Sequence, residues 1–196
     1  MKSALLVIDA QNIYTDSTSE LYCEDAEITI NNINRLIAHA RKNGEPVVLI
    51  KHQHNADGSD CGFLFDHEGT GSGGDISFVE GTPEVDLDSR IKVQPGDEII
   101  VKTRYSSFAG TPLKEILDKN TIQRVIICGF MTNFCCESTA RNALDIDFVV
   151  DFVSDATGTP GTSDYNQDEI REIVGNILGE RFARVFKTTE DYLENK

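Results

Sequence analysis

Short, almost continuous apolar runs recur along the chain and are separated by polar stretches. Runs of this length and continuity are typical of strands that are buried on both faces of a sheet. They are ALLVI before Asp9, PVVLI before Lys51, EIIV before Lys102, VIIC before Gly129, FVVDFV before Ser154, and FARVF near the end. The pattern predicts about six buried strands.

Stretches with helical spacing of apolar residues lie between these runs, at residues 28–42, 113–117, 135–144 and 170–178. Strands and helices that alternate over a whole chain favour a doubly wound α/β fold. We therefore predict a mostly parallel sheet of about six strands with helices on both faces. A length of 196 residues predicts one domain, residues 1–196.

Residues 52–97 depart from this alternation, because they are rich in Gly, Asp and Pro and have little periodicity. A long irregular stretch inside a compact domain is usually functional or disordered. We expect a lid or a substrate-facing segment, with a contact between subunits as a further use.

Composition narrows the classes of partner. The formal net charge is −15 and the pI is near 4.5, so duplex nucleic acid and anionic membranes would repel the chain. No apolar run approaches the ~18 residues of a membrane helix, and Asp9 interrupts the first run before it reaches the length of a signal-peptide core. The cysteines are an odd, unevenly spaced set, Cys23, Cys61, Cys128, Cys135 and Cys136. We therefore expect reduced thiols and a cytoplasmic protein.

Three reactive residues, Asp9, Lys102 and Cys135, fall at the ends of predicted strands. Ligands of open α/β sheets bind at the carboxyl ends of the strands. Cys135 also opens a predicted helix, where the positive end of the helix dipole would lower the pKa of a thiol and favour attack on a carbonyl. Asp9 would accept the thiol proton, Lys102 would orient Asp9, and the amides of Met131 and Cys135 would hold an oxyanion. The alternative is that Cys135 is an inert buried cysteine.

Four blocks of sequence carry a family resemblance: LLVIDAQNIY (5–14), VKTRYSSFAGTPL (101–113), VIICGFMTNFCCESTARNAL (125–144) and VSDATGT (153–159). Together and in this order they resemble the isochorismatase-like cysteine hydrolases, a superfamily that includes nicotinamidase and N-carbamoylsarcosine amidohydrolase. The resemblance implies a catalytic triad of Asp9, Lys102 and Cys135. It also implies a cis peptide bond at Phe130-Met131, and assembly as a homodimer or homotetramer.

Relatives that bind a metal carry an Asp-x-His pair after the second strand, where this chain has Lys51-His52-Gln53-His54. Because the aspartate is missing, we predict no metal. Attack by a thiol and hydrolysis of a thioester need no organic cofactor, so we predict none. The alternative is a zinc site built from His52, His54 or His67, since imidazole is a good zinc ligand.

Further residues are candidates for contact with a substrate. The proposed contacts are Gln11, His52, Arg104 and Tyr105. The alternatives are a surface role for Gln11, a solvated side chain for Arg104 and a packed side chain for Tyr105. Phe63, Phe65 and Phe108 are candidate pocket walls, with ordinary core packing as the alternative for each.

A retained cysteine favours hydrolysis of a C-N bond, because cleavage of the vinyl ether of isochorismate does not require a thiol nucleophile. We therefore predict a cysteine-dependent hydrolase of a small amide, imide or ureide that works through a thioester. The alternatives are hydrolysis of isochorismate or another non-amide substrate, and a non-catalytic protein that binds a small metabolite or a partner.

Overall fold

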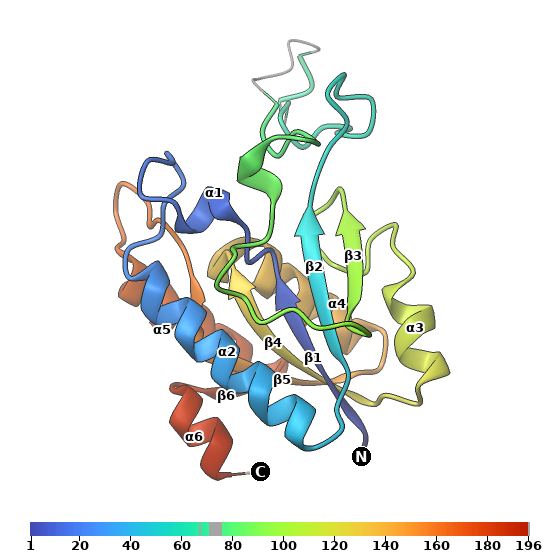
Figure 1. The fold of residues 1–196 in the computed structure, drawn as a ribbon. Helices are drawn as coiled ribbons and strands as arrows, with labels where there is room; N and C mark the ends of the chain where they lie inside the picture. The colour runs from blue at the N-terminus through green and yellow to red at the C-terminus, as the bar shows by residue number, and fades with distance from the viewer. Residues whose placement is uncertain (67, 71–75, 196) are drawn as a thin grey trace.

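A six-stranded sheet forms the centre of the computed structural model (Figure 1), which describes residues 1–66, 68–70 and 76–195. Every pair of neighbouring strands is parallel. The strands lie in the order β3 (Glu98–Lys102), β2 (Val47–His52), β1 (Ser3–Ile8), β4 (Arg124–Phe130), β5 (Val149–Gly158) and β6 (Arg184–Phe186). The predicted doubly wound α/β fold is confirmed, and the sheet is wholly rather than mostly parallel.

Burial on both faces explains the uninterrupted apolar runs. In β1, Leu5 and Val7 pack into one hydrophobic cluster, while Leu6 and Ile8 pack into a second cluster on the opposite face. Successive side chains of a strand point to opposite faces, so a central strand needs apolar residues at every position.

Helices cover both faces of the sheet. Two of them, α2 (Ala26–Lys42) and α6 (Thr189–Glu194), contribute to the cluster that contains Leu5. The opposite cluster is built with α3 (Leu113–Lys119), α4 (Glu137–Asp145) and α5 (Gln167–Arg181). The short helix α1 (Asn12–Thr15) follows β1 and contacts the 3-10 turn η1 (Pro83–Val85). Among the described residues, no helix is long and apolar enough to cross a membrane.

The chain order reverses between β1 and β4, because β2 and β3 continue to one side of β1 while β5 and β6 continue beyond β4. A crevice at such a reversal is the usual ligand site of an open α/β sheet. Gly129 permits the close approach of these two strands. Its φ is +120°, and a Cβ at this position would lie 1.9 Å from the carbonyl oxygen of Ile8.

After β2, residues 53–66 lie beyond the carboxyl end of that strand, and the chain that follows η1 runs back to the start of β3 (Figure 1). The described residues between β2 and β3 form turns, isolated bridges and η1. This agrees with the irregular segment expected from the sequence, and residues 53–66 stand at the end of the sheet where a ligand would enter.

Candidate active site

The ends of neighbouring strands bring the candidate residues together. In sheet order, Lys102 is the last residue of β3, His52 is the last residue of β2, and Asp9 follows the last residue of β1. The turn after β4 then supplies Cys135. The three residues predicted from the sequence therefore meet at one edge of the sheet, with His52 among them.

Lys102 is the centre of the polar contacts. Its Nζ lies 2.7 Å from Oδ2 of Asp9, 3.2 Å from Sγ of Cys135 and 3.0 Å from the carbonyl oxygen of Arg104. The ammonium group thus forms two hydrogen bonds, to Arg104 and Cys135, and an ion pair with Asp9. Burial lowers the pKa of Lys102, but the charges of Asp9 and Cys135 outweigh burial and the net direction is upward. Lys102 is therefore a fixed, buried cation.

Asp9 is fully buried and sits in an unusual backbone conformation. Its exposed fraction is 0% and its φ is +48°, in the left-handed region that residues other than glycine seldom adopt. Its backbone N–H donates to the carbonyl oxygen of Ile50 at 2.9 Å, which ties the turn to β2. Burial raises the pKa of Asp9 and Lys102 only partly offsets it, a direction that makes the carboxylate a stronger base.

Cys135 lies in a short π-helical turn, Thr132–Cys136, that precedes α4. Burial, then the carboxylate of Asp9, raises the pKa of its thiol to about 12, although Lys102 opposes this. The sequence led us to expect a lowered pKa, and that expectation is wrong for the free protein. The physical reason is that Cys135 is inside the turn and fully buried beside an acid, so the helix dipole is not the dominant influence.

The turn that carries Cys135 is fixed at both ends. The Phe130-Met131 peptide bond, for which the resemblance implies the cis form, is cis. The backbone N–H of Cys136 donates to the carbonyl oxygen of Met131 at 3.1 Å. The hydroxyl of Thr132 donates to that of Thr157 on β5 at 2.9 Å. These contacts hold the thiol at the boundary between β4 and β5.

A cavity of about 190 Å³ opens onto Cys135. Its walls are mainly aromatic and aliphatic, and they include residues of the long irregular segment. The lining residues are Tyr14, Leu21, His52, Leu64, Phe65, Ser77, Phe78, Tyr105, Met131, Phe134 and Cys135. This volume is below the ~300–1,000 Å³ of pockets for drug-sized ligands, so the cavity suits a small molecule. Within the part of the chain that the structure describes, four larger hollows lie elsewhere on the surface, and Asp9, Lys102 and Cys135 line none of these four.

The family model of the isochorismatase domain matches residues 3–190 of this chain. The chain belongs to the isochorismatase domain family. It is 36% identical to Nicotinamidase 3 of Arabidopsis thaliana over 80% of this chain and 73% of that protein. It is 28% identical to the ureidoacrylate amidohydrolase RutB of Variovorax paradoxus, over 98% of this chain and 81% of that protein.

Solved structures of the isochorismatase family share this fold. The cysteine hydrolase from Pseudomonas syringae pv. phaseolicola 1448A superimposes with a TM-score of 0.90 at 26% identity, over 98% of this chain and 91% of that one. The family resemblance inferred from the four sequence blocks is confirmed.

Two of the four expected substrate contacts line the cavity and two do not. His52 and Tyr105 are lining residues. The amide of Gln11 instead bonds to the backbone of β2 and η1, donating to the carbonyl oxygens of His52 at 2.9 Å and Val85 at 2.8 Å and accepting from the N–H of His52 at 2.8 Å. Both ends of this amide are in use, so Gln11 braces the end of β2, and it does not line the cavity.

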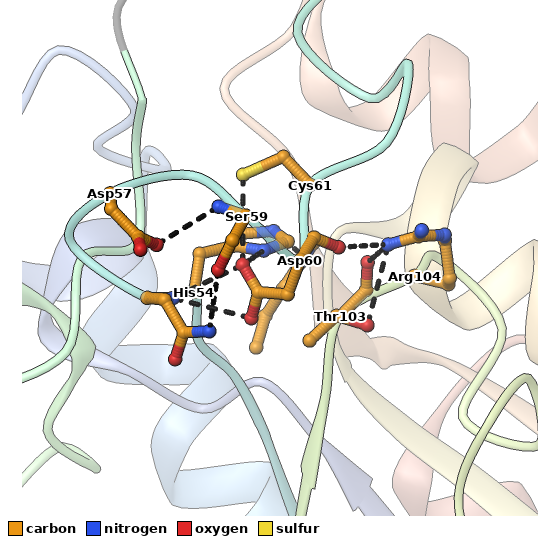
Figure 2. Close-up of polar contacts among 9 residues, drawn as sticks. His54, Asp57, Ser59, Asp60, Cys61, Thr103 and Arg104 are labelled. Carbon is orange, nitrogen blue, oxygen red and sulfur yellow. Dashed lines mark hydrogen bonds and ion pairs between the residues drawn. The ribbon is translucent and has the colours of Figure 1, made fainter.

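Arg104 also differs from expectation. Its Nη1 donates to the carbonyl oxygens of Asp60 at 2.8 Å and Thr103 at 2.6 Å, so the guanidinium holds the loop after β2 (Figure 2). Of the candidate wall residues, Phe65 lines the cavity, Phe63 is 74% exposed, and Phe108 packs in the core. Arg104, Phe63 and Phe108 therefore do not line this cavity, and Phe108 follows the core-packing alternative.

Tyr14 and Phe78 are cavity residues that the sequence analysis missed. Tyr14 stacks on Phe130, with ring centroids 5.5 Å apart, and Phe78 stacks on His52 at 4.6 Å. Tyr14 lies in the quoted block 5–14, so its position five residues after Asp9 was the available signal. Phe78 lies in the irregular segment, where the sequence has no periodicity to place it.

Two groups of three potential metal ligands occur among the described residues, Asp9 with His52 and Cys135, and His54 with Asp60 and Cys61. Neither fits a divalent ion in this arrangement. The ammonium of Lys102 stands against the first group. In the second, both ring nitrogens of His54 are already in hydrogen bonds, one of them with Asp60. Burial also raises the pKa of the Cys61 thiol. His67, the other histidine considered, lies outside the described residues.

Proposed function

We propose that this member of the isochorismatase family is a cysteine hydrolase that cleaves the C-N bond of a small amide, imide or ureide. The observation that carries the proposal is the buried contact of Lys102 with both Asp9 and Cys135 beside a small cavity. A buried ion pair next to a thiol is costly to maintain, which favours a chemical use over a packing role.

The first half of the reaction forms a thioester. Asp9 accepts the proton of the Cys135 thiol as the sulfur attacks the carbonyl carbon, because the raised pKa of the thiol requires a base at that moment. The electron pair of the C=O bond moves to oxygen, where the amides of Met131 and Cys135 stabilise it. The C-N bond then breaks, and Asp9 returns the proton to the leaving amine.

The second half hydrolyses the thioester. Asp9, again a carboxylate, removes a proton from water as the water oxygen attacks the thioester carbon. The C-S bond breaks, the acid is released, and Cys135 regains its proton. Lys102 stays protonated throughout and stabilises the negative charge on Asp9 or on sulfur.

The lining of the cavity supports a small, mainly uncharged substrate, and the names of the relatives support a carboxamide or a ureide. The lining is mainly apolar, and the ammonium of Lys102 has its three partners already. The two named relatives act, by their names, on nicotinamide and on ureidoacrylate, which are a carboxamide and a ureide. Both compound classes belong in the substrate panel.

The test is release of ammonia from small carboxamides, imides and ureides by the parent protein and by Cys135→Ala. Cys136→Ala is the matched control, because Cys136 is also buried and adjacent but does not line the cavity. We expect release by the parent and by Cys136→Ala and none by Cys135→Ala. A covalent acyl adduct on Cys135, detected by mass spectrometry after acid quenching, would support the thioester step.

Equal release by the parent and Cys135→Ala would refute the role of Cys135. Release by neither, with both folded by circular dichroism, would count against C-N hydrolysis and favour a non-amide substrate or a binding function.

Two further proposals concern the setting of the protein. All five cysteines are free thiols, which supports a reducing compartment such as the cytoplasm. Assembly as a homodimer or homotetramer rests on the family resemblance, and light scattering coupled to size exclusion measures it directly.

A further inference from the structure

A chain of hydrogen bonds leads from the cavity into the loop after β2. Nε2 of His52 lies 3.0 Å from Nε2 of His54, and Nδ1 of His54 lies 3.3 Å from Oδ1 of Asp60. Asp60 also accepts from the backbone N–H of Asn55 with both carboxylate oxygens, at 3.1 and 3.2 Å. Figure 2 shows His54 and Asp60 in contact at the base of this loop, which Arg104 ties to β3.

The carboxylate at the end of the chain determines where each imidazole proton lies. A carboxylate only accepts hydrogen bonds, so Nδ1 of His54 carries a proton and donates it to Asp60. A neutral imidazole has one N–H, so Nε2 of His54 is an acceptor and Nε2 of His52 must be the donor between the two rings. Nδ1 of His52 is then left with a lone pair.

Both rings are neutral under ordinary conditions. Burial, then the charge of Lys102, lowers the pKa of His52 to about 2. Burial also lowers the pKa of His54, although Asp60 partly offsets it. Each of the two rings therefore carries one N–H proton.

His52 is held in place beside the reactive groups. Its ring stacks on Phe78 at 4.6 Å with an interplanar angle of 13°, and Gln11 binds its backbone on both sides. One of its ring nitrogens lies within 4.8 Å of a carboxylate oxygen of Asp9 and of Sγ of Cys135. Within the part of the chain that the structure describes, Nδ1 has no hydrogen-bond partner, and His52 lines the cavity.

We infer that Nδ1 of His52 is the hydrogen-bond acceptor that recognises an N–H group of the substrate, and that His54 and Asp60 hold His52 in the tautomer that makes it one. The inference rests on the proposed function, because it concerns the substrate of the same site. It selects amides and ureides that carry an additional N–H near the scissile carbonyl. A ring nitrogen or oxygen with a lone pair would face the lone pair of Nδ1 and is disfavoured.

The tautomers can be read directly by NMR of the full chain labelled with ¹⁵N in its histidine rings. Two-bond nitrogen–proton correlations report which ring nitrogen carries the proton, and spectra of His52→Gln and His54→Gln assign the signals. We expect the proton on Nε2 of His52 and on Nδ1 of His54. A proton on Nδ1 of His52 would overturn the inference.

Substrate selection can be measured by binding, without turnover, in Cys135→Ala. Pyrrole carboxamides and furan carboxamides are matched in size but differ in one ring N–H against one ring oxygen, and the 2- and 3-isomers sample two positions of that group. We expect at least one pyrrole isomer to bind about tenfold more tightly than its furan counterpart, the contribution of one hydrogen bond. His52→Leu in the same background should abolish the difference.

Asp60 is tested as a positioning residue. Asp60→Ala should reduce the pyrrole-to-furan ratio. Asp57→Ala should leave it unchanged, because among the described residues exposed Asp57 bonds to Ser59 and not to a histidine (Figure 2). If no pyrrole isomer binds more tightly than its furan counterpart, absent binding included, the inference fails. If the parent hydrolyses no amide while the tautomers and the binding ratio hold, the proposed hydrolysis fails and the recognition by His52 stands.

Discussion

The contact between Asp9 and Lys102 makes a quantitative prediction about stability. Both side chains are fully buried and their charged atoms are 2.7 Å apart. At an effective dielectric constant of about 20, the attraction over this distance is about 6 kcal/mol. Part of it offsets the desolvation of the two charges, and removal of one partner from a buried pair typically costs about 3–5 kcal/mol. We expect Lys102→Met to lower the free energy of unfolding by that amount.

A double-mutant cycle separates the ion pair from ordinary packing. If the cost of Lys102→Met comes from an unpaired carboxylate, then adding Asp9→Asn should recover much of it, with a coupling energy of about 2 kcal/mol or more. Lys114 and Asp118 provide the control, because their charged atoms are 2.6 Å apart but the side chains are 48% and 53% exposed. Their cycle should give about 0.3–0.5 kcal/mol.

The pH dependence of Lys102→Met has a definite sign. Without Lys102, burial raises the pKa of Asp9 with no cation to offset it. A group whose pKa is raised on folding stabilises the fold fully at pH values below its pKa in the unfolded state. This stabilisation is lost as the pH rises through its pKa in the folded state. The loss in free energy of unfolding caused by Lys102→Met should therefore be smallest in acid and grow toward neutral pH.

Urea unfolding followed by circular dichroism, at one fixed protein concentration, measures all of these differences. Equal coupling energies for the buried and the exposed pair would refute the reasoning, and so would a deficit that shrinks as pH rises.

Three other predictions concern Gly129, the pKa of Cys135 and the need for a metal. Gly129→Ala should lower the free energy of unfolding by at least ~3 kcal/mol, because the added Cβ would lie 1.9 Å from the carbonyl oxygen of Ile8. Gly179→Ala in α5 is the control: its Cβ would lie 3.8 Å from Val185, and the change should raise the free energy of unfolding by up to about 1 kcal/mol. Equal effects of the two changes would contradict this. Asp9→Asn should abolish hydrolysis. Iodoacetamide at pH 8 should nevertheless alkylate Cys135 about tenfold faster in this variant than in the parent, because Asp9 raises the pKa of that thiol. Slower alkylation of the variant would contradict this. Dialysis against EDTA should leave the hydrolysis rate within about twofold, whereas a loss restored by zinc would reveal a metal site.

The fold could be predicted because the four central strands, β2, β1, β4 and β5, are largely buried on both faces. A parallel strand in that environment is apolar at nearly every position, so these runs stand out without any knowledge of their partners. The edge strands β3 and β6 are more exposed than the six buried strands that the pattern predicts. The apolar runs end at Asp9, at Lys102 and shortly before Cys135, and the carboxyl ends of parallel strands share one edge. Proximity of the three residues therefore follows from local sequence.

Side-chain direction could not be predicted, because residues distant in sequence determine it. Gln11 lies in the expected region, but its partners are 41 and 74 residues away. Arg104 turns toward Asp60, 44 residues away, rather than toward the cavity. The prediction of a lowered pKa for Cys135 failed for a related reason. The start of a helix is visible in the sequence, whereas the burial of the thiol beside Asp9 is a property of the assembled sheet.

Specificity and chemistry consequently come from different kinds of segment in this protein. The groups proposed to react are attached to the regular sheet and its immediate turns, where the sequence is informative. The residues that shape the cavity and fix the tautomer of His52 include Phe65, Phe78 and Asp60, all from the irregular segment. We therefore expect changes in that segment to alter the substrate while the contacts of Asp9, Lys102 and Cys135 stay intact. The Asp60→Ala experiment examines this separation directly, because it should alter which amide binds without altering the contacts of Lys102.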